Sequence, residues 1–257
     1  MYITTAGRTD ETYIQKAKQL ALHHNFKYIN RNKLSIEALH NKYNEDIIVV
    51  GKERLELFKL GKKEPIFFHP NSAAFRLKRL IKGETEPFLE VTKLQNGMSF
   101  LDCTLGLASD SIIASYIVGK NGKVTGLEGN RTVAFIVQEG LKTWPSENEA
   151  LVKAMERVQV VTTDHKEYLQ TLDSNSYDVV YFDPMFTETI EESQGILPLK
   201  SVAIYEGLTE LTINEAYRVA KSRVVLKDHW KSDHFKKFNF QVQVRKTAKF
   251  HFGVLEK

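Results

Sequence analysis

The stretch from Phe100 to Asp110 constrains the fold of this chain more than any other. Its apolar start, Phe100-Leu101, is typical of the end of a buried strand, and Gly106 follows after a short polar interval. From Asp110 onward apolar residues recur at helical spacing, which predicts a helix directly after the turn. A strand, a glycine turn and a helix N-terminus together make a cradle in which backbone N–H groups can approach a nucleoside-type ligand.

Strand-like and helix-like segments alternate from Met98 to the end of the chain, as a parallel sheet requires. The predicted strands are 99–102, 123–127, 158–161, 177–182, 223–227, 240–244 and 250–255, and the predicted helices are 110–119, 131–143, a short one near 166–172, and 203–220. The last two strands leave little room for a helix, which predicts an antiparallel hairpin. The expected fold is α/β: a doubly wound, seven-stranded, Rossmann-like sheet with a small N-terminal α/β domain.

Residues 1–68 are predicted to form that N-terminal domain, and residues 69–257 the larger one. The elements expected in the small domain are strands at 2–5, 27–29, 47–50, 54–60 and 65–68, and two helices that begin after Thr9 or Asp10 and after Ser35. His69-Pro70 then interrupts the pattern, and a basic helix is expected from Ser72. The sequence does not indicate what the N-terminal domain does.

Composition is that of a globular protein from a reducing compartment. The hydrophobic content of 42% is normal for such a protein, and no apolar run is long enough to span a membrane. The N-terminus lacks the apolar stretch of a signal peptide. A single cysteine, Cys103, excludes an internal disulfide and is typical of a small buried hydrophobe beside a strand end. We therefore expect a cytoplasmic protein without a membrane partner, of unknown oligomeric state.

Charge is distributed unevenly along the chain. Residues 1–97 carry 17 Lys and Arg against 11 Asp and Glu, residues 98–217 carry 8 against 18, and residues 218–257 carry 11 against 3. Basic ends around an acidic middle suit a polyanionic partner such as RNA. Several basic side chains are candidate phosphate contacts, although solvated helix faces explain them about equally well. These are Arg76, Lys78, Arg79 and Lys82 in one helix, and Lys227, Lys231, Lys236 and Lys237 near the C-terminus.

An acidic residue follows each of the first four strands of the predicted sheet: Asp102, Glu128, Asp164 and Asp183. In a doubly wound sheet, ligands bind at the carboxyl ends of the strands. An acid after the second strand can accept hydrogen bonds from both ribose hydroxyls, and an acid after the third from an adenine amino group. Taken singly, Glu128 could be a surface cap and Asp164 a helix N-cap. Four acids in register favour a nucleoside cofactor.

The segment after the fourth strand separates two classes of cofactor. A nicotinamide enzyme would share Glu128, but it would need more glycines near Gly106 and has no use for Asp-Pro-Met-Phe. Over residues 69–255 the chain resembles the class I S-adenosylmethionine-dependent methyltransferases, and among them the RsmJ-like family of small-subunit ribosomal RNA guanine-N2 methyltransferases. The resemblance rests on His69-Pro70, Asp102-x-Thr104-x-Gly106-Leu107-x-x-Asp110, Leu127-Glu128-x-Asn130, Tyr181-x-Asp183-Pro184-Met185-Phe186 and the ending around Phe250.

This resemblance implies S-adenosylmethionine as the cofactor and RNA, in that family ribosomal RNA, as the partner. It implies that the cofactor is bound by Asp102, Thr104, Gly106, Asp110, Glu128 and Asp164, and the target base by Asp183, Pro184, Met185 and Phe186. The chain departs from the family pattern at Ala108, where a second glycine is usual, and at Thr187, where proline is usual. Glu188, Glu191 and Glu192 replace a basic segment, and residues 1–68 look unlike the best-known members.

The expected chemistry is methyl transfer to an exocyclic amine of a base. Such a nitrogen is a poor nucleophile because its lone pair is delocalised into the ring. Asp183 and the Pro184 carbonyl can accept its two N–H bonds and orient it, while Phe186 can stack on the base. No metal is needed, and the eight histidines are scattered.

Two alternatives to an RNA methyltransferase stay open at this point. One is a methyltransferase acting on a protein amide or a small-molecule amine, because the Asp-Pro-x-aromatic motif also serves glutamine side chains. The other is a non-catalytic RNA-binding module of the same fold, against which the intact Asp183 argues. The sequence does not give the target nucleotide.

Overall fold

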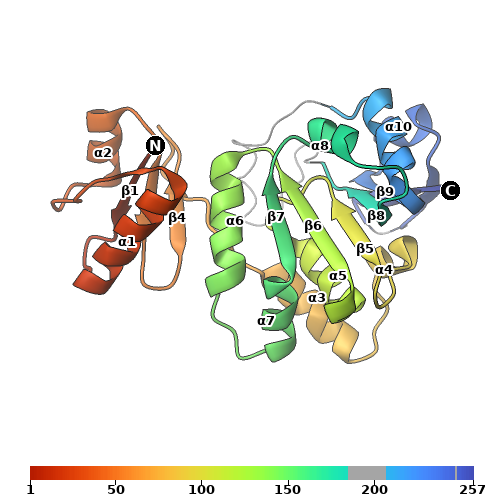
Figure 1. Cartoon of the computed structure of the whole chain (residues 1–257), viewed down its shortest axis with the longest axis horizontal. Coiled ribbons are helices and arrows are strands. Elements are labelled where there is room, and N and C mark those ends of the chain that lie inside the picture. Colours follow the sequence, from red (N-terminus) through yellow and green to blue (C-terminus); the bar gives the residue numbers. More distant parts are fainter. Residues whose placement is uncertain (185–206, 247) are drawn as a thin grey trace.

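The computed structural model describes residues 1–184, 207–246 and 248–257, and it contains two β-sheets. A four-stranded sheet is formed by the N-terminal part of the chain, and a seven-stranded sheet by the remainder. Figure 1 shows the two sheets apart, with α6 (Arg131–Thr143) of the larger unit between them. The two units therefore meet through a helix and not through a shared sheet.

The four-stranded sheet has the order β2-β1-β3-β4. Its strands are β1 (Tyr2–Thr5), β2 (Lys27–Tyr28), β3 (Ile47–Val50) and β4 (Leu55–Phe58), and only β4 runs antiparallel to its neighbour. Two helices connect the parallel strands, α1 (Glu11–His24) and α2 (Ile36–Tyr43). Asp10 and Ser35 cap them, because their side chains accept the backbone N–H bonds of Thr12 and Ala38 at 3.0 Å.

The seven-stranded sheet has the order β10-β11-β9-β8-β5-β6-β7. Its strands are β5 (Ser99–Asp102), β6 (Lys123–Glu128), β7 (Val158–Thr162), β8 (Tyr177–Phe182), β9 (Ala220–His229), β10 (Gln241–Gln243) and β11 (Phe250–Glu256). The first five are parallel, whereas β11 is antiparallel to both β9 and β10. The predicted fold class, with its closing antiparallel hairpin, is confirmed.

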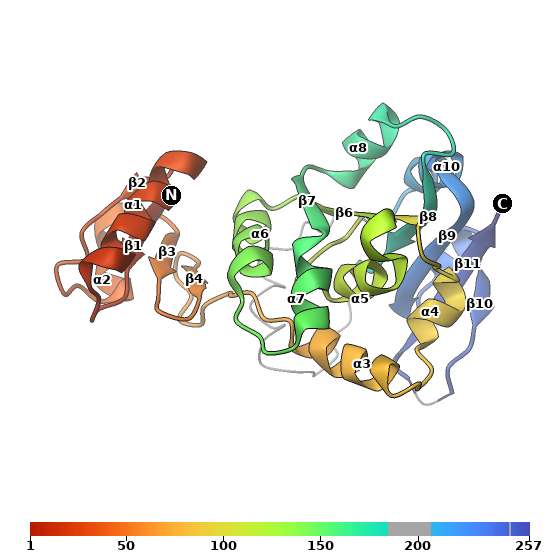
Figure 2. The same ribbon diagram turned by 60° about the horizontal axis from the view of Figure 1, so that its bottom comes forward.

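Side chains of this sheet point alternately to two layers of helices. On β8, Val179 and Tyr181 belong to one hydrophobic cluster, and Val180 and Phe182 to another. The first cluster is covered by α3 (Asn71–Ile81), α4 (Pro87–Thr92), α5 (Ser109–Val118), α6 and α7 (Glu149–Glu156), and the second by α8 (His165–Thr171), α10 (Glu210–Val219) and α11 (His234–Lys237). Figure 2 shows α8 and α10 on one side of the sheet and α3, α5 and α7 on the other. Cover on both faces makes the sheet doubly wound.

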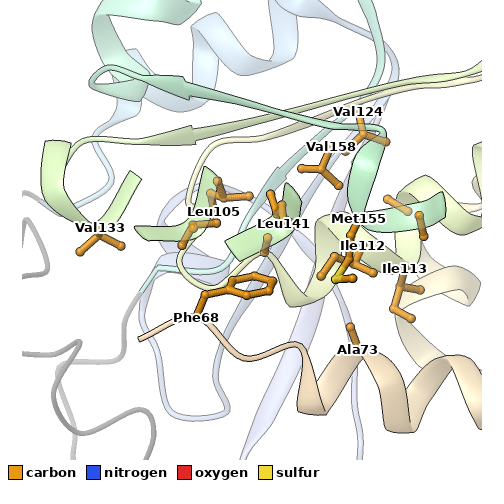
Figure 3. Packing of buried hydrophobic residues seen from close by; sticks show 14 of the residues in the cluster. Phe68, Ala73, Leu105, Ile112, Ile113, Val124, Val133, Leu141, Met155 and Val158 are labelled. Carbon is orange, nitrogen blue, oxygen red and sulfur yellow. The ribbon is translucent and has the colours of Figure 1, made fainter. Parts of the chain in front are cut away.

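Two glycines allow the first layer to pack closely. A Cβ atom on Gly126 of β6 would lie 2.3 Å from the Cδ1 atom of Leu105, which follows β5. A Cβ atom on Gly140 of α6 would lie at the same distance from the Phe68 ring. Leu105 and Phe68 belong to one cluster of buried side chains (Figure 3). Because Leu105 occupies the space above Gly126, the turn after β5 is seated directly on β6.

The N-terminal unit packs on α6 through the end of α1. The Arg131 guanidinium donates a hydrogen bond to the His24 carbonyl oxygen at 2.9 Å. The rings of Phe26 and Phe135 meet edge to face with their centroids 5.1 Å apart. The helix that receives these contacts begins just after Glu128, so the N-terminal unit adjoins the predicted cofactor edge.

Three local expectations differ from the structure. The helix expected over 203–220 is α10, which begins at Glu210, while residues 203–206 lie outside the described residues. The helix α7 was not predicted, although Asn148 caps it by accepting the N–H bonds of Ala150 and Leu151. Residues 65–68 contribute one bridge, between Ile66 and Leu57, in place of a full strand.

Candidate functional site

The carboxyl ends of four parallel strands bring the predicted acids to one edge of the sheet. Asp102 and Glu128 are the last residues of β5 and β6, and Asp183 directly follows β8. Asp164 comes two residues after β7 and is the N-cap of α8. Because β5 lies between β6 and β8, Asp102 stands at the centre of this edge, where the direction of winding changes.

Asp102 organises the turn that follows β5. Its side chain is buried, and its carboxylate accepts hydrogen bonds from the Thr104 N–H at 3.0 Å and from the Ser111 hydroxyl at 2.7 Å. Burial raises the pKa of Asp102 to about 7, although both hydrogen bonds favour the ionised form. Both oxygens therefore face the protein, and Asp102 acts on a ligand through the shape of the turn.

The turn itself has the conformation of a ligand cradle. Gly106 has a φ of +49°, and a Cβ atom there would meet nothing closer than 3.9 Å. Ala108, at the position of the second family glycine, is also left-handed with a φ of +62°. Thr104 links this turn to the neighbouring strand, since its hydroxyl accepts the Asp183 N–H at 2.6 Å. The turn after β5 and the residue after β8 are thus held together.

Glu128 and Asp164 are partly buried acceptors on the same edge. The Glu128 carboxylate accepts the Asn130 N–H at 2.8 Å, and a further bond from the Gly106 N–H favours its ionised form. Burial nevertheless raises the pKa of Glu128 above its usual value. One Asp164 oxygen accepts the Lys166 N–H at 2.7 Å. A carboxylate has about four acceptor sites, so both side chains can still receive ligand hydroxyl or amino groups.

Asp183 forms an ion pair that the sequence did not indicate. Its Oδ2 atom lies 2.6 Å from the Nζ atom of Lys227, which comes from the neighbouring strand β9. Lys227 had been grouped with candidate phosphate contacts or solvated lysines, but only 19% of its side chain is exposed. Burial raises the pKa of Asp183 to about 6, while the ammonium of Lys227 opposes this rise.

Asp110 joins the same group of charges from α5. Its Oδ1 atom accepts from the Arg76 guanidinium at 2.6 Å, and its Oδ2 atom accepts from the Tyr181 hydroxyl at 2.8 Å. Lys227 Nζ lies 3.5 Å from the same Oδ2 atom. These cations hold the pKa of Asp110 well below its usual range despite burial. Glu86, which accepts from Arg76 at 2.9 Å, completes a buried chain of alternating charges.

Two residues of this arrangement had been given other roles from the sequence. Arg76 was a candidate phosphate contact, but it is 15% exposed and engages two carboxylates. Asp110 was expected to bind the cofactor, and in the structure its two oxygens accept from Arg76 and Tyr181, so direct contact with the cofactor stays a prediction. Arg79 remains on the surface and pairs with Glu84 at 2.6 Å. The physical reason is that α3 turns one basic side chain inward, against α5, and the other outward.

The predicted base-binding residues are only partly described. Pro184 is partly buried beside Asp183, whereas Met185 and Phe186 lie outside the described residues. Within residues 1–184, 207–246 and 248–257, no group of three His, Cys, Asp or Glu side chains is placed to hold a metal ion. No helix in the same part of the chain is long and apolar enough to cross a membrane.

A family model described as "Putative SAM-dependent methyltransferase" matches residues 29–254. The chain belongs to this family. S-adenosylmethionine is therefore its cofactor, and the predicted family resemblance is confirmed. The "Uncharacterized protein YpiP" of Bacillus subtilis (strain 168) is 51% identical over 255 residues, which cover 99% of this chain and 98% of that relative.

More distant relatives carry the name ribosomal RNA small subunit methyltransferase J. The protein from Vibrio vulnificus (strain YJ016) is 25% identical over 206 residues, covering 74% of this chain and 78% of the relative. The protein from Acinetobacter baumannii (strain ATCC 17978) is 31% identical over 142 residues, which are 54% of this chain and only about half (49%) of that relative. The crystal structure of the SAM-dependent methyltransferase NGO1261 from Neisseria gonorrhoeae covers 100% of this chain and 96% of its own, with a TM-score of 0.64 at 18% identity, and shows the shared fold.

The residues at the carboxyl edge fit this cofactor. Open space in front of Gly106 lets a ligand approach the backbone, and Glu128 offers acceptor sites for a ribose diol. S-adenosylmethionine supplies an electrophilic methyl group on a sulfonium, so a carboxylate next to the reacting centre favours the positive charge that develops there. Asp183 lies beside the turn after β5, because its backbone N–H donates to the Thr104 hydroxyl.

Proposed function

We propose that this methyltransferase transfers the methyl group to an exocyclic amine of a base in RNA, with ribosomal RNA as the favoured class. The observation that carries the proposal is the placement of Asp183 after β8, where its backbone N–H donates to the Thr104 hydroxyl and its carboxylate accepts from Lys227. An acceptor at this position can take an N–H bond of the amine and direct the nitrogen lone pair toward the methyl group. The Pro184 carbonyl is proposed to accept the second N–H bond.

The remaining roles follow from the same proposal. Glu128 is proposed to hold the ribose hydroxyls and Asp164 the adenine amino group, while Asp102, Thr104 and Gly106 shape the turn around the cofactor. Met185 and Phe186 are proposed to contact the base, as the family resemblance implies. Their side chains lie outside the described residues, so this part of the proposal stands on the sequence alone.

A basic C-terminal segment with an exposed tryptophan supports an RNA substrate. Trp230 directly follows β9, is 51% exposed, and has the Lys231 ammonium 5.1 Å from its ring. Arg245 stacks on Phe250, with its guanidinium carbon 4.6 Å from the ring centroid. Five cations in this region form no ion pair with a carboxylate among the described residues: Lys231, Lys236, Lys237, Arg245 and Lys246. An aromatic ring among unpaired cations suits a strand of nucleotides, because bases stack and phosphates pair.

The name of the RsmJ relatives supports ribosomal RNA, and the departures in this chain keep the target nucleotide open. A protein amide or a small-molecule amine is the second candidate, because the same Asp-Pro motif would orient either nitrogen. The exposed Trp230 and its neighbouring cations favour RNA over a small-molecule amine, because a small amine would not contact them.

The test is transfer of a radiolabelled methyl group from S-adenosylmethionine to separate RNA, protein and metabolite fractions. We expect label in RNA, in a base that yields an N-methylated nucleoside on digestion. Asp183→Asn should reduce single-turnover transfer by roughly 100-fold or more while cofactor affinity is kept. Asp173→Asn is the matched control. Asp173 is exposed in the loop between α8 and β8, so this variant should transfer the methyl group at the normal rate. Label in protein or metabolites, or normal turnover by Asp183→Asn, contradicts the proposal.

A further inference from the structure

Lys227 is a partly buried cation that contacts both Asp110 and Asp183, and the proposed methyl transfer does not yet assign it a role. It lies near the end of β9, one residue beyond the register pair of Phe182 and Leu226. This places its side chain beside Asp183, which is one residue beyond Phe182 on the other strand. The Phe250 ring of β11 lies 4.9 Å from its ammonium nitrogen. Two strands therefore direct a lysine toward the carboxylate that is to contact the substrate.

We propose that Lys227 is a positioning residue for methyl transfer: its ammonium keeps the Asp183 carboxylate ionised and turned toward the substrate amine. The inference rests on the proposed function, because it assigns Asp183 the role of amine acceptor. The contact is to Oδ2, at 2.6 Å. The second oxygen thereby has a defined direction, since a carboxylate with one oxygen held by a cation cannot rotate freely.

The surroundings of Asp183 explain why such a cation is needed. The charged and titratable groups that act on it among the described residues are Lys227, Asp110, Asp102 and Tyr181, with Arg76 acting on Lys227 from α3. Two of these are carboxylates, and like charges in a partly buried site disfavour each other's ionisation. Lys227 lies between Asp110 and Asp183 and is the cation that contacts both.

The two carboxylates are not equivalent when Lys227 is removed. Asp110 keeps the Arg76 guanidinium at 2.6 Å and the Tyr181 hydroxyl at 2.8 Å, so it stays ionised. The Asp183 carboxylate would keep no cation among the described residues, because its neighbour Asp110 is itself an anion and the Thr104 hydroxyl accepts from the Asp183 backbone N–H. The proton that relieves the repulsion therefore goes to Asp183. A protonated Asp183 presents a hydroxyl donor to the amine and loses part of its acceptor capacity.

The predicted signature is a pH profile. In the wild-type protein, Asp183 has a pKa of about 6 and is mostly ionised at neutral pH. Lys227→Met should raise this pKa, and a rise of about two units would leave roughly a tenth of the molecules ionised at pH 7. Single-turnover transfer at neutral pH should then fall about tenfold and recover as the pH is raised. Lys227→Gln, which keeps a donor without the charge, should behave in the same way.

The experiment measures single-turnover methyl transfer to the RNA fraction between pH 6 and pH 9, at saturating cofactor and RNA, for the full chain. Lys227→Arg retains the charge and should keep its midpoint close to that of the wild-type protein. Lys221→Met is the matched control, because Lys221 lies at the opposite end of β9 and pairs with Asp178 at 3.5 Å. Calorimetry with S-adenosylmethionine should give the same affinity for all four variants.

Each outcome decides the question. A midpoint in Lys227→Met and Lys227→Gln equal to that of the wild-type protein overturns the inference, even if the rate falls. Loss of cofactor binding in both variants and in Lys227→Arg also overturns it, because Lys227 would then serve the fold itself. Normal transfer by Asp183→Asn overturns the proposed function instead, and the two failures can therefore be told apart.

Discussion

The two halves of the candidate site hold their carboxylates by different means. Asp102, Glu128 and Asp164 each accept a hydrogen bond from the backbone N–H two residues later, at 3.0, 2.8 and 2.7 Å. We call this the backbone-held half. Asp110 and Asp183 instead pair with Arg76 and Lys227, which come from other elements of the fold. We call this the ion-paired half.

The two halves of the site therefore differ in how much they depend on the packing of distant elements. A turn in which a carboxylate caps its own backbone can form as soon as its strand ends, and it depends little on the rest of the fold. The ion-paired half exists only when α3, α5, β8 and β9 are packed together. Removing one of its members leaves a buried charge without a partner, which is far more costly than losing a single neutral hydrogen bond.

The largest expected effect is on the free energy of unfolding, when Arg76 is removed from the ion-paired half. Arg76→Ala would leave Asp110 and Glu86 buried without their shared cation, and we expect it to lower the free energy of unfolding by about 3–5 kcal/mol. Arg79→Ala, on the same helix, removes only an exposed pair with Glu84 and should have little effect. Urea denaturation of both variants measures the difference. Equal losses would show that the ion-paired half contributes no more to stability than an exposed ion pair.

The second effect concerns stability and pH in the backbone-held half. Burial raises the pKa of Asp102 to about 7, so the folded chain binds this proton more tightly than the unfolded chain does. Its contribution is fully present below the ordinary pKa near 4 and is lost as the pH rises through 7, by at most about 1.4 kcal/mol per unit. Asp102→Asn should flatten the decline between pH 4 and pH 7. Denaturant titrations across that range give the slope, and an unchanged slope would assign the decline to other groups such as Asp183.

A smaller loss is expected when the backbone-held half is altered at the proposed ribose contact. Glu128→Ala removes an acceptor that adjoins the Gly106 turn, and cofactor binding should weaken by about 1–3 kcal/mol. At saturating cofactor the transfer rate should stay near that of the wild-type protein, since Asp183 and Lys227 are unaffected. Calorimetry and single-turnover kinetics separate the two quantities. Unchanged affinity in a folded variant would remove Glu128 from the cofactor site.

The smallest effect concerns the turn itself. Ala108 has a φ of +62°, a conformation that costs an L-residue more than glycine. Ala108→Gly relieves this strain but increases the entropy of the unfolded chain, so we expect a change in stability of less than about 1 kcal/mol. Thermal melts with and without S-adenosylmethionine measure it. A large loss of cofactor affinity would mean that the alanine methyl group, and not the backbone, contacts the ligand.

Most of the fold could be predicted from the sequence because strands, turns and helix caps depend on residues that are close together in the chain. The strands of the larger sheet follow from short apolar runs. Residue type and position predict the helix caps at Thr9 or Asp10 and at Ser35, of which the structure has Asp10 and Ser35. The position of four acids at one edge follows from the parallel order of the strands. The same reasoning grouped Lys227 with surface lysines and placed Arg76 on an exposed face, because spacing along one helix or strand does not say which neighbour covers it.

The sequence by itself determined the alternation of strands and helices, the glycine turn and the backbone-held carboxylates, because each depends on residues within a few positions of one another. Only the tertiary structure decided that Asp110 and Asp183 share Lys227, which is 117 and 44 residues away along the chain. Burial and proximity set the charge state of such a group, and both arise when distant elements pack. The chemistry proposed for Asp183 therefore depends on contacts that no local pattern contains.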